Sequence, residues 1–167
     1  MKKCIYLVEG DCEEKLIKAL KEKPALVLPG RVKILNVVQN EIPRSIMMSL
    51  EPGSLVVFVF DTDKEVTEHL KKNIEVLRRL KFNFTVLTFA QVLNFEDEIV
   101  RATDVRKAQE LTKSTSVRDF KTDFCKMKAA SCRSALERHH LDVGKLWVTT
   151  PPEVFSFITQ ESEKVKI

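Results

Sequence analysis

The sequence has little of what builds disordered, disulfide-rich or membrane-spanning chains. Its 167 residues include only 4 Gly and 6 Pro, so long low-complexity or disordered stretches are not expected. No apolar run approaches the roughly 20 residues that a membrane-spanning helix needs. The four cysteines form no CxxC pair and accompany no matching pair of histidines. We therefore predict reduced thiols and neither a zinc site nor a disulfide framework.

The amino-terminal segment lacks the pattern of a secretion signal. A basic start and a short apolar run over residues 4–8 are followed at once by Glu9, Asp11, Glu13 and Glu14. A signal peptide carries a longer apolar region before its cleavage site. We therefore expect a cytoplasmic protein.

The composition is that of a single globular domain, with 44% hydrophobic and 31% charged residues. The net charge of +4 is modest, but it is unevenly distributed. Acidic residues crowd near residues 9–14 and 96–98, whereas lysine and arginine dominate residues 101–138. An acidic pocket beside a basic surface suits a polyanionic substrate, although a solvated helical face explains the basic stretch equally well.

Hydrophobic patterning predicts alternating strands and helices over the first ninety residues. Strands are expected at residues 4–8, 32–38, 54–60 and 82–89, and helices at 11–21, 44–50 and 64–80. The segment SLVVFVF at 54–60 is apolar on both faces, which is typical of a central strand in a parallel sheet covered by helices. This alternation predicts an α/β, Rossmann-like fold with a central, mostly parallel sheet flanked by helices.

The pattern changes after residue 90. Helices are expected at 95–102, 105–111 and 117–139, followed by a last strand at 146–148 and a short terminal helix. No linker or internal repeat is evident. We therefore predict one domain over residues 1–167, with a core at about 3–90 and a mostly helical extension at about 91–167.

Two acidic motifs follow predicted strands. Glu9 ends the first strand, and Glu13 lies one helical turn later; Asp61 and Asp63 directly follow SLVVFVF. Ligands of open α/β sheets bind at the carboxyl ends of the strands. Carboxylates converging there repel one another unless a cation neutralises them. Oxygen ligands without His or Cys favour Mg²⁺ or Mn²⁺ over zinc.

This combination resembles the Toprim domain of topoisomerases, primases, ribosomal RNA maturases and nucleases of the overcoming-lysogenization-defect class. In that family one apolar strand ends in Glu-Gly and a later strand ends in Asp-x-Asp. The segments YLVEG at 6–10 and FVFDTD at 58–63 match these elements, and VEGxxE at 8–13 is most similar to the nuclease branch. The resemblance covers roughly residues 3–90.

The resemblance implies a Mg²⁺- or Mn²⁺-dependent nuclease or phosphodiesterase that acts on nucleic acid, and a defence or repair system is one setting in which such nucleases work. Glu9, Asp61 and Asp63 would be catalytic, and Glu13 would join them in holding the metal. Nuclease relatives often carry a later acidic residue, so Glu96 or Asp97 is a candidate ligand for a second metal. Such nucleases usually come with an ATPase or another module, so a protein partner that supplies one is also implied. On charge alone, the candidates for phosphate contact are Lys121, Lys126 and Lys128.

Other interpretations stay open. The chain could be a non-catalytic module of the same fold that binds nucleic acid, a nucleotide or a protein. The segment FVFDTDKEVT also resembles haloacid-dehalogenase phosphatases, but their motif opens the fold and continues with Gly-Thr, whereas Lys64 and Glu65 follow here. A glycosyltransferase-type metal motif is a further alternative, for which the chain is small.

Overall fold

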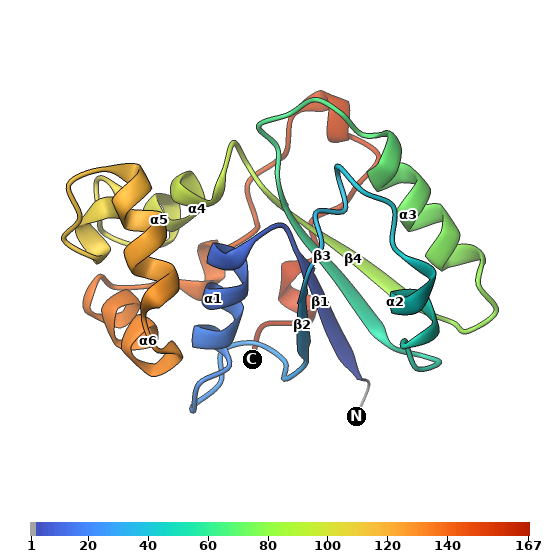
Figure 1. Cartoon of the computed structure of the whole chain (residues 1–167), viewed down its shortest axis with the longest axis horizontal. Helices are drawn as coiled ribbons and strands as arrows, with labels where there is room; N and C mark the ends of the chain where they lie inside the picture. Colours follow the sequence, from blue (N-terminus) through green and yellow to red (C-terminus); the bar gives the residue numbers. More distant parts are fainter. Residues whose placement is uncertain (1–2) are drawn as a thin grey trace.

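The computed structural model describes residues 3–167, over which one parallel sheet organises the chain (Figure 1). Its strands are β1 (Cys4–Val8), β2 (Arg31–Ile34), β3 (Leu55–Asp61) and β4 (Thr85–Gln91). They lie in the order β2-β1-β3-β4, and every pair is parallel. The predicted α/β, Rossmann-like fold class is therefore confirmed.

Helices cover both faces of the sheet. They are α1 (Asp11–Leu20), α2 (Arg44–Met48), α3 (Glu68–Arg79), α4 (Phe95–Ala102), α5 (Val117–Lys126) and α6 (Ala129–Arg138). Figure 1 shows α2 and α3 on one side of the sheet, with α1, α4, α5 and α6 on the other. Short 3-10 helices are found at Ala108–Leu111, Val143–Lys145, Glu153–Phe155 and Ser162–Lys164. The molecule thus has three layers.

Each face of the sheet has its own hydrophobic core. Successive side chains of a strand point to opposite faces, so Tyr6 and Val8 pack in the core that contains α1, whereas Ile5 and Leu7 pack in the core beneath α3. Trp147 from the carboxy-terminal segment stacks within the first of these cores. Burial on both faces explains why β1 and β3 are apolar almost throughout.

The strand order places a crevice between β1 and β3. From β1 the chain moves outward to β2 at one edge, and from β3 it moves outward to β4 at the other. The loops that leave the carboxyl ends of β1 and β3 therefore diverge, which is the position where open α/β sheets bind ligands. Glu9 directly follows β1, and Asp61 is the last residue of β3.

Several predicted elements have different bounds in the structure. The helix expected at 64–80 begins only at Glu68, and the strand expected at 32–38 ends at Ile34. The helix expected at 117–139 is two helices, because Met127 and Lys128 adopt extended backbone angles. The helix expected at 105–111 is reduced to a 3-10 turn, and residues 146–148 form no strand.

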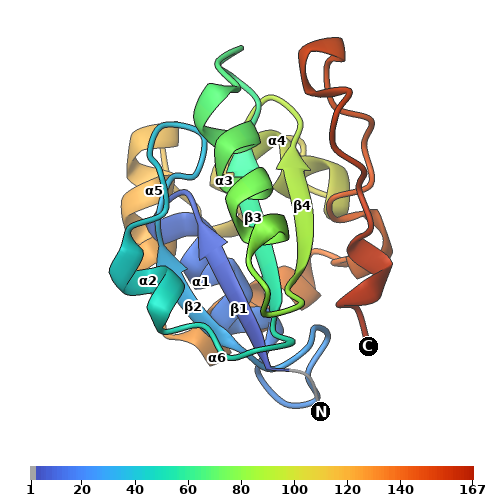
Figure 2. The same cartoon turned by 90° about the vertical axis from the view of Figure 1, so that its right-hand side faces the viewer.

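The carboxy-terminal segment returns along β4 as a mostly irregular chain (Figure 2). Gln160 forms a bridge with Thr88, and its side-chain amide both donates to Ala90 O and accepts from Ala90 N, each at 2.9 Å. The predicted extension thus has α-helices only as far as Arg138, and beyond it only short 3-10 helices. None of the helices in the described residues is long and apolar enough to cross a membrane.

Candidate carboxylate site

Glu9 connects three segments at the carboxyl end of the sheet. One of its carboxylate oxygens accepts a hydrogen bond from Asn36 Nδ2 at 2.8 Å, and the other accepts one from the Asp61 backbone N–H at 2.9 Å. Burial raises the pKa of Glu9, and the charge of Asp63 raises it further, whereas these two hydrogen bonds act in the opposite direction. Glu9 is therefore fixed in position at the start of the crevice.

Glu13 enters the site from the first turn of α1. Its Oε2 accepts a hydrogen bond from the Gly10 backbone N–H at 2.9 Å, which satisfies one of the free amides at the start of the helix. The side chain is almost fully buried, with 4% of the residue exposed. Burial raises the pKa of Glu13 to about 7, and the nearby charge of Glu9 adds to the effect.

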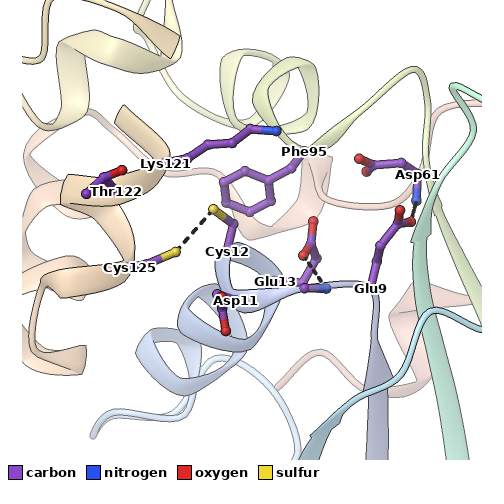
Figure 3. Close-up of a pocket in the computed structure, with 10 residues that line it drawn as sticks. Glu9, Asp11, Cys12, Glu13, Asp61, Phe95, Lys121, Thr122 and Cys125 are labelled. Carbon is purple, nitrogen blue, oxygen red and sulfur yellow. Dashed lines mark hydrogen bonds between the residues drawn. The ribbon is translucent and has the colours of Figure 1, made fainter. Parts of the chain in front are cut away.

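Asp61 faces Glu13 across the crevice (Figure 3). Burial raises the pKa of Asp61 to about 8, and the charges of Glu13 and Glu9 contribute further. Without a cation, the most buried carboxyls of the site are thus partly protonated near neutral pH. A positive ion placed between them would favour their ionised forms.

Gln91, the last residue of β4, lies beneath these two carboxylates. With its amide nitrogen facing them, it donates to Asp61 Oδ1 at 2.9 Å and to Glu13 Oε1 at 3.2 Å. The opposite orientation of the amide would place its oxygen against two acceptors. Gln91 is fully buried, so its amide is a fixed donor that brings Asp61 and Glu13 together.

A pocket opens over these carboxylates. Its lining residues are Glu9, Gly10, Asp11, Cys12, Glu13, Asp61, Phe95, Lys121, Thr122 and Cys125. In Figure 3, Lys121 extends from α5 across the ring of Phe95 toward the carboxylates. The pocket thus combines a carboxylate wall with one lysine opposite.

Lys121 pairs with Glu96 of α4, with 2.9 Å between Nζ and Oε1. Burial alone would lower the pKa of Lys121, but the hydrogen bond and charge of Glu96 raise it above its usual value. The charge of Glu96 also contributes to the raised pKa of Asp61. Of the two predicted candidates for a second metal, Glu96 therefore borders the site.

Other predicted residues lie outside the pocket. Asp63 is exposed beyond the end of β3, although its charge reaches Glu9 and Asp61. The backbone N–H of Asp97 donates to the Asn94 side chain that begins α4. Lys126 and Lys128 are exposed at the junction of α5 and α6 and are not among the lining residues.

Sequence reasoning missed Asn36 and Gln91. Gln91 had a signal, because it is a polar residue at the end of an apolar strand, in the position that corresponds to Asp61 of β3. Asn36 had no such signal, because it lies in a turn after β2, within residues that were predicted to be part of a longer strand. Both residues donate amide hydrogen bonds to the carboxylates.

The carboxylate oxygens of the site are the type of ligand that a hard divalent cation prefers, but they are not arranged as a complete coordination shell. Glu9, Glu13 and Asp61 offer carboxylate oxygens, and their raised pKa values reflect burial without enough neutralising charge. Within residues 3–167, however, no three His, Cys, Asp or Glu side chains are grouped closely enough to hold a metal ion. To hold a metal ion together, the side chains of Glu13 and Asp61 would have to rotate away from Gln91.

Comparisons of this chain with protein-family models, with curated proteins and with solved structures found no match.

Proposed function

We propose that this protein is a Toprim-like, divalent-metal-dependent phosphodiesterase that acts on nucleic acid. The observation that carries the proposal is the convergence of Glu9, Glu13 and Asp61 at the divergence point of a parallel sheet, with Lys121 opposite them. Carboxylates facing a lysine across an open pocket provide sites for a cation and for the phosphate that the cation would contact.

The residues that would hold Mg²⁺ or Mn²⁺ are Glu9, Glu13 and Asp61, because all three carboxylates line the pocket. A bound divalent ion would neutralise phosphate charge and lower the pKa of an attacking water. Glu9 would also fix the β1 end of the site through its hydrogen bonds from Asn36 and from the Asp61 backbone. Asp63 lies within electrostatic range and would strengthen the attraction for the cation.

Lys121 would contact the phosphate of the substrate. Its present partner, Glu96, holds the ammonium group at the rim of the pocket. An incoming phosphate offers the same type of charge-assisted hydrogen bond. Phe95 lines the same pocket, and Lys121 extends across its ring toward the carboxylates.

Two observations favour a second function, a non-catalytic module that binds nucleic acid, a nucleotide or a protein. Both Glu9 oxygens are engaged, and the described residues contain no ready three-ligand group. A domain of this kind would bind in the same pocket without turnover. Turnover would then depend on a protein partner, such as one that supplies an ATPase or a targeting module.

The test is cleavage of labelled single- and double-stranded DNA and RNA with Mg²⁺ or Mn²⁺. Wild type is compared with Asp61→Asn and with Glu65→Gln, a matched loss of one exposed carboxylate outside the pocket. We expect metal-dependent cutting by wild type and Glu65→Gln, with at least a hundredfold loss in Asp61→Asn. Equal cutting by all three proteins would refute the assignment. Metal-dependent binding of nucleic acid without cutting would favour the binding module.

A further inference from the structure

Two cysteines from distant parts of the chain meet at the mouth of the carboxylate pocket. Cys12 lies in α1 and Cys125 in α5, 113 residues apart, and their sulfur atoms are 3.3 Å from each other. A disulfide requires a separation of about 2.0 Å, so a small approach of the two side chains would allow the bond. Both residues line the pocket (Figure 3).

Their surroundings differ in a way that gives each sulfur a separate role. Cys12 is buried, with 8% of the residue exposed, whereas Cys125 is half-buried and reachable from solvent. The other cysteines, Cys4 and Cys132, are buried and do not line the pocket. The pair at the pocket mouth is therefore the one that a small reagent in the pocket reaches first.

We propose that Cys12 and Cys125 form a reversible disulfide that connects α1 to α5 and weakens cation binding in the carboxylate pocket. The effect on cation binding rests on the proposed function, whereas formation of the disulfide does not. The oxidant is a small-molecule disulfide such as oxidised glutathione.

The reaction is two successive thiol–disulfide exchanges. Cys125 attacks one sulfur of the small disulfide, forming a mixed disulfide and releasing one small thiol, which takes the proton of Cys125. Cys12 then attacks the Cys125 sulfur, which forms the intramolecular bond and releases the second small thiol with the proton of Cys12. The two protein sulfurs are oxidised by two electrons in total, and one small disulfide is reduced to two thiols.

The cross-link would change the pocket because its two ends flank the site residues. Cys12 is adjacent to Glu13, and Cys125 lies one helical turn after Lys121 on α5. Pulling the two sulfurs together moves the turn that carries Lys121 toward Glu13 and Asp61. The lysine charge then competes more strongly with a cation. If the ammonium group moves from about 8 Å to about 7 Å from a divalent ion, at an effective dielectric constant of about 20, the added repulsion corresponds to roughly threefold weaker binding of that ion.

The first experiment equilibrates the full chain in glutathione buffers of increasing oxidation, followed by alkylation and mass spectrometry. We expect the peptides of Cys12 and Cys125 to be linked and unalkylated, with a mass 2 Da below the sum of the two peptides with free thiols. Cys132→Ser is the matched control and should oxidise as wild type does. Cys125→Ser should give no intramolecular bond. Glutathione adducts alone, or a link through Cys132 or Cys4, would overturn the proposal.

The second experiment measures Mn²⁺ binding to the reduced and oxidised forms by calorimetry. Weaker binding to the oxidised form, by about threefold, supports the regulatory role. Equal Mn²⁺ binding by both forms would overturn that role. Cys125→Ser is the control, and its Mn²⁺ binding should not change on oxidation. If neither form binds Mn²⁺, the proposed function fails, while the mass measurement still decides whether the disulfide forms.

Discussion

Replacing Asp61 with Asn should stabilise the metal-free protein, and the gain should grow with pH. The pKa of Asp61 is raised to about 8 in the folded protein, chiefly by burial, whereas an unfolded chain has an aspartate pKa near 3.9. The folded state thus holds its proton over a range in which the unfolded state has lost it. The stability due to protonated Asp61 is complete below about pH 4 and declines as the pH rises to about 8.

The size of the effect follows from about 1.4 kcal/mol per pH unit. Asp61 is partly exposed and neighbouring carboxyls share the protonation, so screening reduces the full slope. Between pH 6 and pH 8 we expect the stability advantage of Asp61→Asn over wild type to widen by about 1–2 kcal/mol. The amide keeps an oxygen that accepts from Gln91, so packing should be preserved.

Urea unfolding in the presence of a chelator, at pH 6 and pH 8, measures this difference. Glu65→Gln is the control, because this exposed carboxylate follows the same strand by four residues and does not line the pocket. Its stability should stay within about 0.5 kcal/mol of wild type, as for most surface changes. A constant difference between Asp61→Asn and wild type at both pH values would refute the electrostatic reasoning.

Two further predictions concern the cation and the support of the site. Addition of Mg²⁺ at about 100 times its dissociation constant should stabilise wild type by about 2.7 kcal/mol and Asp61→Asn by much less. Thermal unfolding would detect the difference, and equal shifts in the melting temperature of both proteins would place the cation elsewhere. Asn73→Ala should cost about 2–4 kcal/mol, because the buried Asn73 side chain donates to Val37 O and Asn40 O and accepts from Ile42 N. Unchanged urea midpoints for Asn73→Ala would contradict this role.

The sheet was predictable because its strands depend on local patterning. Runs of buried apolar residues with polar ends give β1 and β3, and the N-cap Asn94 helps to set the start of α4 at the predicted residue. The carboxyl ends of parallel strands lie at one edge of a sheet, so the sequence predicted Glu9 and Asp61 at the same edge. Their direct contact depends on the adjacency of β1 and β3, which the structure shows.

What could not be predicted depends on contacts between distant residues. The break between α5 and α6 has no Gly or Pro to signal it, and the Met127 carbonyl there accepts a hydrogen bond from the Lys15 ammonium group. Asp63 lies outside the pocket because β3 ends at Asp61. If the strand continued, its alternation would place the Asp61 and Asp63 side chains on the same face. The meeting of Cys12 and Cys125 has no local signature at all.

The side chain of Gln160 acts as a substitute peptide unit for the outer edge of the sheet. An amide that both donates to and accepts from Ala90 completes the pairing that a fifth strand would otherwise provide. Unpaired strand edges are templates for aggregation and for strand exchange between molecules. At this position β4 is therefore closed to a strand from another chain, whereas the other edge of the sheet is the four-residue strand β2.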